Sequence, residues 1–124
     1  MQDGAITEES IRAMVDLFYQ RVREDPVLGP VFEHHLAERW HLHMPRMYAF
    51  WTKVLLGTAE FQGNVFGKHM ALDGIGKEHF VHWLALFRQT AEETHGQAEA
   101  QEIMTVAERI ATSLQLGYFG ERVV

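Results

Sequence analysis

Cysteine is missing from this sequence of 124 residues, and its absence excludes disulfides, thiolate zinc sites, cysteine nucleophiles and iron–sulfur clusters held by cysteine. Basic residues are also scarce, because 11 lysines and arginines stand against 17 acidic residues, for a formal charge of −6. This balance argues against nucleic acid or an anionic membrane as the main partner. No apolar run approaches the roughly 18–20 residues that a transmembrane helix needs, and the first ten residues lack the basic and apolar regions of a signal peptide. We therefore expect a cytoplasmic protein.

The residues that are present indicate a globular chain rich in aromatic rings. Hydrophobic residues make up 47% of the sequence and charged residues 23%, which is the balance of a folded domain. A chain of this length buries roughly two-thirds of the surface that it exposes when unfolded. Eight histidines, eight phenylalanines, three tyrosines and three tryptophans are many for such a short chain. We expect one domain over residues 1–124, in which residues 1–6 form a loose N-terminal extension.

Apolar residues recur at helical spacing along nearly the whole chain, and glycine and proline mark the breaks at 26–30, 57–67 and 74–76. The predicted helices are one that begins after Thr7 and ends at Asp25, one that ends at Gly57, a short one over 65–72, one over 77–95 with a C-cap at Gly96, and a last one that carries Ile103 to Leu114. No segment shows the alternation of a strand. The fold class is therefore all-α, with about five helices.

Four of these segments each place one polar ring on an apolar stripe. The residues are Tyr19, His43, His69 and Trp83. Any one of them could be an ordinary core residue, since a buried polar group left unpaired costs about 1–3 kcal/mol and usually finds a backbone partner. Together they could instead converge on a shared ligand. A haem would suit them, because it needs an imidazole for its iron, an apolar slot for its faces, and donors for a bound gas that acquires negative charge.

Several longer stretches resemble the truncated haemoglobins of the third group. Residues 17–23 (LFYQRVR) and 25–32 (DPVLGPVF) resemble the second helix of this family and the turn that follows it. Residues 40–47 (WHLHMPRM) and 50–57 (FWTKVLLG) resemble the distal helix. Residues 68–72 (KHMAL) resemble the proximal segment, and residues 80–84 (FVHWL) resemble the helix that carries the distal tryptophan. The resemblance runs from about residue 7 to residue 118, and the Gly-Gly pairs of the first two groups are missing. It implies a shortened globin fold, a two-over-two helical sandwich around haem.

The same resemblance implies a role for each polar ring. His69 would be the proximal ligand of the iron, Tyr19 and Trp83 would donate hydrogen bonds to the bound gas, and His43 would be the distal histidine. The residues that would line the haem cavity are Phe18, Phe32, Met47, Phe50, Trp51 and Phe66. Pro45 follows His43 by two residues and suits a helix that begins near residue 43, because proline is tolerated in a first turn.

The function implied is that of a haem b protein that binds dioxygen, carbon monoxide and nitric oxide. An alternative is a haem enzyme for nitric oxide dioxygenation or peroxidase-like oxygen chemistry. Such an enzyme would need a separate reductase as a partner, since this chain has no flavin or nicotinamide domain. A second alternative is a helical interaction module without haem, whose apolar faces serve a partner protein.

The remaining histidines have simpler interpretations. His41 and His43 form an H-x-H pair with His34 and His35 nearby, which makes a zinc or nickel site a further alternative, although this spacing suits a strand better than a helix. His82 is expected in solvent. His95, at the end of a predicted helix, is expected to interact with the helix dipole and to have no other role.

Overall fold

The computed structural model describes residues 4–57 and 74–120, and all regular structure in these two ranges is helical. The elements are α1 (Glu8–Glu24), α2 (Leu28–Leu36), the short 3₁₀ helix η1 (Ala37–Arg39), α3 (Trp40–Leu56), α5 (Lys77–Thr94) and α6 (Gln97–Phe119). The predicted all-α class is confirmed. The predicted short helix over 65–72 lies outside the described residues. Among the described helices, none has the length and apolar character required to cross a bilayer.

Two helix ends follow directly from local sequence. Thr7 caps α1: its hydroxyl accepts the backbone N–H of Ser10 at 3.0 Å, and the Ser10 hydroxyl accepts the N–H of Thr7 at 2.8 Å. This reciprocal pair is a capping box, which satisfies N–H groups that a helix start leaves open. α3 ends before Gly57, its C-cap, whose φ of 72° is accessible to glycine at little cost. Both predicted ends are confirmed.

The break predicted at residues 26–30 is shorter than expected, because α2 begins inside it at Leu28. The Asp25 carboxylate makes this possible: it accepts the backbone N–H groups of Val27 at 2.9 Å and Leu28 at 2.8 Å. Pro30 then falls in the first turn of α2, where its missing N–H leaves no bond unmade. These capping bonds hold the pKa of Asp25 below its usual value, although burial acts in the opposite direction.

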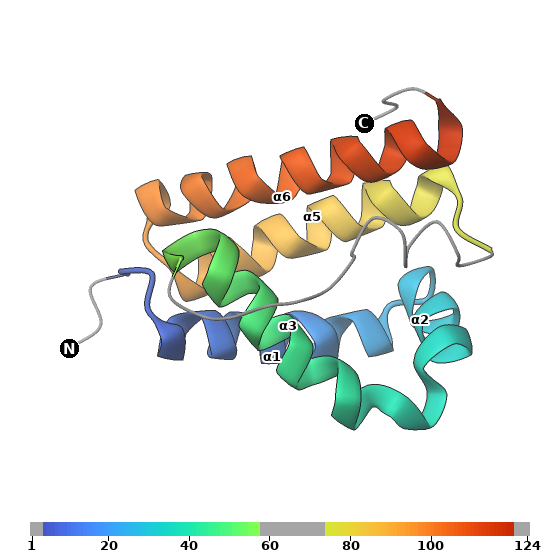
Figure 1. The fold of residues 1–124 in the computed structure, drawn as a ribbon, viewed down its shortest axis with the longest axis horizontal. Coiled ribbons are helices and arrows are strands. Elements are labelled where there is room, and N and C mark those ends of the chain that lie inside the picture. Colours follow the sequence, from blue (N-terminus) through green and yellow to red (C-terminus); the bar gives the residue numbers. More distant parts are fainter. Residues whose placement is uncertain (1–3, 58–73, 121–124) are drawn as a thin grey trace.

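The helices form two layers. Figure 1 shows α5 and α6 side by side and antiparallel, joined by a short turn, with α3 crossing α1 below them. Contacts run between α5 and α6, between α1 and α5, and between α1 and α3. This is the predicted two-over-two arrangement. α1 packs against α2, α3 and α5, so it joins its own layer to α5 of the other layer.

The core is built mainly from α1 and α6. Its buried residues on these helices are Ile11, Met14, Val15, Phe18, Tyr19, Val22, Ala100, Ile103, Met104 and Ala107. They recur every three or four residues, the periodicity that places side chains on one face of a helix. Ile6, before α1, packs against the same core. Gly4 lies still earlier, and its carbonyl accepts the N–H of Gly96 at 3.1 Å.

His95 differs from its prediction. It is 7% exposed, its Nε2 lies 2.8 Å from the Ser10 hydroxyl, and its Nδ1 lies 2.9 Å from the Thr94 hydroxyl. Burial lowers the pKa of the ring, so a neutral imidazole that joins α1 to the end of α5 replaces the expected cation at a helix dipole. Gly96, predicted as the C-cap of this helix, is instead the N-cap of α6.

The lowered pKa of His95 predicts a pH dependence of folding. The unfolded chain takes up a proton as pH falls through about 6.5, histidine's ordinary pKa, whereas the folded chain does so only at lower pH. Within that window the unfolded state binds more protons, so the free energy of unfolding should decrease as pH falls. Urea titrations at several pH values in this range should show that the free energy of unfolding decreases less with falling pH in H95Q than in the parent. H41Q, at an exposed position, should behave like the parent; equal slopes in all three chains would contradict this account.

Candidate functional site

An aromatic network joins most of the predicted site residues, and Phe18 is its junction. The Phe18 ring centroid lies 5.0 Å from that of Tyr19, 5.7 Å from Trp83 and 4.9 Å from Phe87, all edge to face. Phe18 itself is 1% exposed. Such T-shaped pairs add about 0.5–1.5 kcal/mol beyond the area they bury. Phe18 therefore contacts both Tyr19 on α1 and Trp83 on α5, two residues that are 64 positions apart in the sequence.

Tyr19 occupies the centre of one half of the network. Its ring lies 5.0 Å from His43 at an interplanar angle of 89°, and 5.9 Å from both Phe32 and Trp40. The residue is 7% exposed, and no hydrogen bond joins its hydroxyl to any residue of the described ranges. Burial raises the pKa of the phenol well above its ordinary value. Tyr19 therefore stays protonated, and its hydroxyl can donate a hydrogen bond to a ligand.

His43 joins this network even though Pro45 is not in a first turn. α3 begins at Trp40, so Pro45 lies inside the helix and removes the N–H that would bond the carbonyl of His41, an exposed residue. The His43 ring nevertheless lies edge-on to Tyr19 and, at 5.9 Å, to Trp40. Its Nε2 is buried. The condition that the helix begin near residue 43 is thus not met, and His43 faces the interior without it.

The other half of the network is a stack of three rings. Trp83 lies parallel to Phe87 at 5.0 Å and 2°, and Trp51 of α3 stacks on Phe87 at 4.8 Å and 25°. Phe50 touches the edge of Trp51 at 5.4 Å. Trp83 is partly buried, and its indole N–H makes no hydrogen bond within the part of the chain that the structure describes. It offers a second donor, which contacts Phe18 as Tyr19 does.

The structure therefore brings together most of the predicted site residues, from four different helices. Tyr19, Phe32, His43, Trp51 and Trp83 belong to one network of ring contacts. Met47 and Phe50 are partly buried and pack against the same core. The two remaining predictions, His69 as iron ligand and Phe66 in the lining, lie outside the described residues.

Two members of the network were not predicted as site residues. Trp40 stacks at 6.4 Å on Phe32 and meets both Tyr19 and His43 with its edge, and Phe87 holds the stack of Trp51 and Trp83. Helical spacing could have found both, since Trp40 is three residues before His43 and Phe87 is four after Trp83. Helical spacing alone could not show that these two rings, and not other apolar residues on the same stripes, belong to the site.

The other histidines do not form a metal site in the described ranges. No group of three His, Asp or Glu side chains there could hold a metal ion, so the zinc or nickel alternative has no support from these residues. His82 is only half exposed rather than free in solvent, because its Nδ1 lies 3.6 Å from the Asp25 carboxylate. This contact links α5 to the cap of α2.

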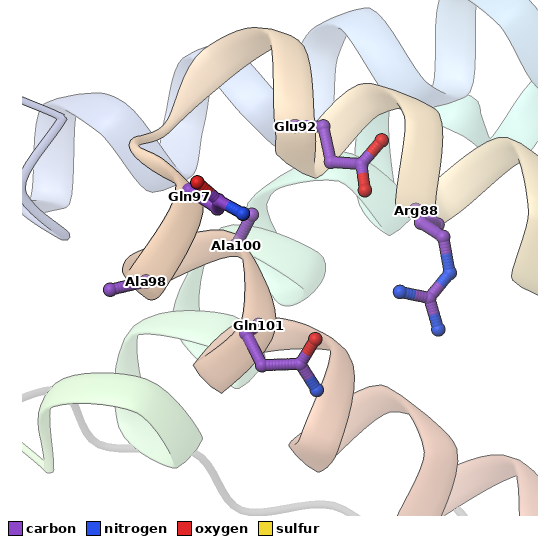
Figure 2. A pocket seen from close by; sticks show the side chains of 6 residues that line it. All are labelled: Arg88, Glu92, Gln97, Ala98, Ala100 and Gln101. Atoms are coloured by element: carbon purple, nitrogen blue, oxygen red, sulfur yellow. The ribbon is translucent and has the colours of Figure 1, made fainter.

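One surface hollow of the described structure lies elsewhere. It has a volume of about 810 Å³ and lies between α5 and α6, lined by Arg88, Glu92, Gln97, Ala98, Ala100 and Gln101. Figure 2 shows the polar side chains of Arg88, Glu92 and Gln101 at its edge. None of the network's rings lines it, so it is not the candidate site.

The network combines the apolar walls that a flat apolar group requires with the polar atoms that a small bound ligand requires. Its walls are aromatic, and its polar atoms are the Tyr19 hydroxyl, the His43 ring nitrogens and the Trp83 indole N–H, which come from three different helices. Two of these groups make no hydrogen bond to a described residue, so they are available to a ligand. The described residues therefore fit one face of a haem and a gas bound to it.

Comparison with known proteins identifies the class. The model of the bacterial-like globin family matches residues 4–115, so the chain belongs to this family. Its fold and its family make it a globin, a haem protein that binds diatomic gases.

Within the globins, the similarity is to the truncated haemoglobins of the third group. The group 3 truncated haemoglobin ctb of Campylobacter jejuni is 31% identical over 118 residues, which are 93% of each chain. A crystal structure of a group III truncated haemoglobin from the same species matches with a TM-score of 0.89 at 29% identity, and the match covers 99% of this chain and 100% of that one. The resemblance stated from the sequence motifs is confirmed.

The central ring of the stack, Phe87, predicts a large effect on stability. Phe87 is 1% exposed and contacts three rings, so F87A should lower the free energy of unfolding by about 3–5 kcal/mol, through lost burial and a cavity. Chemical denaturation measures this. Phe119, a partly buried ring at the end of α6, is the matched control, and F119A should cost clearly less. Equal losses would show that Phe87 has no special place in the core.

Proposed function

We propose that this chain binds haem b and holds dioxygen reversibly, with Tyr19 and Trp83 as hydrogen-bond donors to the gas and His69 as the ligand of the iron. The observation that carries the proposal is the buried Tyr19 phenol, which makes no hydrogen bond to a described residue and shares a ring network with His43 and Trp83. A haem, when bound, supplies an iron atom that takes a diatomic gas as a ligand. We further propose a single domain over residues 1–124 and a cytoplasmic location.

The two donors select for dioxygen because this gas becomes negatively charged when it is held. A positioned O–H or N–H donor stabilises such charge strongly in a site that excludes water. Tyr19 is suited to this, since burial raises its pKa and keeps the phenol protonated at any physiological pH. The indole N–H of Trp83 can only donate. Carbon monoxide and nitric oxide would enter the same site and gain less from these donors, because they acquire less charge.

The apolar residues exclude water from the donors. Phe18, at the junction, separates Tyr19 from Trp83 and is buried. The further lining consists of Phe32, Met47, Phe50, Trp51 and Phe66. A low-dielectric wall strengthens every hydrogen bond that forms inside it. His43, edge-on to Tyr19, would be a third polar contact or a gate for the gas.

His69 is proposed as the iron ligand from its segment, Lys68 to Leu72, because the sequence there resembles the proximal segment of the family. A neutral imidazole is the form that binds a metal. Its second ring nitrogen would donate to a backbone carbonyl, which fixes both the tautomer and the orientation of the ring. Enzymatic turnover of the bound gas would require a separate reductase, and no contact in the described residues favours that role over reversible binding.

The role of Tyr19 is tested by Y19F, which removes only the hydroxyl. A hydrogen bond to a charged group is worth about 1.5–3 kcal/mol, so the dissociation rate of dioxygen should rise several-fold or more. Stopped-flow displacement by carbon monoxide measures this rate. Tyr48 of α3 donates instead to Asp16, outside the network, so Y48F should leave the rate unchanged. A rate for Y19F equal to that of the parent would remove Tyr19 from the site.

The role of His69 is tested by H69A. The variant should retain little haem after purification, and its absorption spectrum should lose the strong Soret band that shifts when carbon monoxide is added. H41A, at an exposed position on α3, should retain haem like the parent. Full haem content and an unchanged spectrum in H69A would contradict the assignment. A parent chain without a Soret band, even after added hemin, would instead favour the interaction module.

A further inference from the structure

Trp40 separates the interior of the proposed site from solvent. Its ring centroid lies 5.9 Å from that of Tyr19 and 5.9 Å from that of His43, both edge to face, and the residue is 9% exposed. Its face stacks on Phe32 at 6.4 Å and 18°. Trp40 is thus in contact with both polar rings that come from α1 and α3, and it forms the wall behind them.

The outer side of Trp40 is held by two charged side chains. Its indole N–H donates to the Glu33 carboxylate at 3.3 Å, and the Arg23 guanidinium lies over its ring, 4.7 Å from the centroid. Arg23 and Glu33 approach each other at 4.0 Å, and both side chains are 53% exposed. We call these three residues the Trp40 clamp. It joins the end of α1, α2 and the start of α3.

Each member of the clamp is close along the chain to a residue of the site. Arg23 is one helical turn after Tyr19, Glu33 follows Phe32, and Trp40 is nearly one turn before His43. A shift of the clamp would therefore move the backbone that carries the donors. Exposed ion pairs and exposed cation–π contacts contribute little to stability. The clamp is better explained by the geometry it imposes than by the stability it adds.

We propose that Trp40, held by Glu33 and Arg23, is a positioning residue that fixes the orientations of Tyr19 and His43 and keeps water away from the Tyr19 hydroxyl. The proposal rests on the proposed function, because it assumes that these two rings face the bound gas. The indole N–H of Trp40 donates to the Glu33 carboxylate at the surface, so Trp40 adds no donor of its own to the site.

The test changes Glu33, which is at the surface and leaves the core intact. E33A removes the acceptor of the indole N–H, whereas E33Q keeps an acceptor of the same shape. Two readouts apply to the full chain as its ferrous carbon monoxide complex. The first is hydrogen exchange of the Trp40 indole N–H, followed by NMR. The second is the iron–carbon monoxide stretching band, whose frequency and width report how donors are arranged around the gas.

E33A should increase exchange at the Trp40 indole several-fold and should broaden or split the stretching band, because Tyr19 and His43 then adopt more than one orientation. E33Q should restore both readouts toward the parent. The matched control is E93A, which breaks another exposed Arg–Glu pair, Arg21–Glu93 at 2.7 Å, that touches no ring of the network. It should change neither readout.

Y19F, measured beside them, separates the role of the clamp from the role of Tyr19. If Y19F shifts the stretching band and E33A leaves it unchanged, the clamp does not position the donors, and Tyr19 still faces the gas. If Y19F also leaves the band unchanged, Tyr19 does not face the gas and the proposed function fails with it. Equal responses of E33A and E93A would show that an exposed ion pair, and not the clamp, is responsible.

Discussion

The edge-to-face packing of Phe18 is the contact on which the rest of the structure depends. Its ring touches Tyr19, Trp83 and Phe87, so it links the helix that carries one proposed donor to the helix that carries the other. The Phe87 side of this contact continues through Trp51 to α3. Phe18 is thus a buried ring at which the two helical layers meet, and it contacts the rings of both proposed donors.

This arrangement holds the Tyr19 ring, 7% exposed, among apolar side chains, with no hydrogen bond from its hydroxyl to a described residue. The apolar faces of α1 and α6 hold the site in place, and they bury Ile11, Met14 and Ile103 completely. The core therefore extends beyond the lining of the site, and α6 supplies part of that core without contributing a ring to the network.

Much of the fold and of the site could be predicted from the sequence, because both depend on local rules. Helical spacing and the caps at Thr7 and Gly57 placed α1 and the end of α3, and family motifs singled out Tyr19, His43 and Trp83. The features that could not be predicted depend on contacts between distant residues. His95 is buried against Ser10, 85 residues earlier, and burial lowers the pKa of its ring. α2 begins early because the Asp25 side chain turns back onto Leu28. Spacing likewise could not show that the Trp40 indole would meet Glu33.

The bond between Ser10 and His95 has a consequence for the order of assembly. α1 packs against α2, α3 and α5, and its start is fastened to the turn that joins α5 to α6. During synthesis α1, α2 and α3 emerge first, and the face of α1 that packs on α5 stays uncovered until α5 follows. The pocket therefore closes late, when nearly the whole chain has left the ribosome, and the nascent chain must reach that point before it can retain a cofactor.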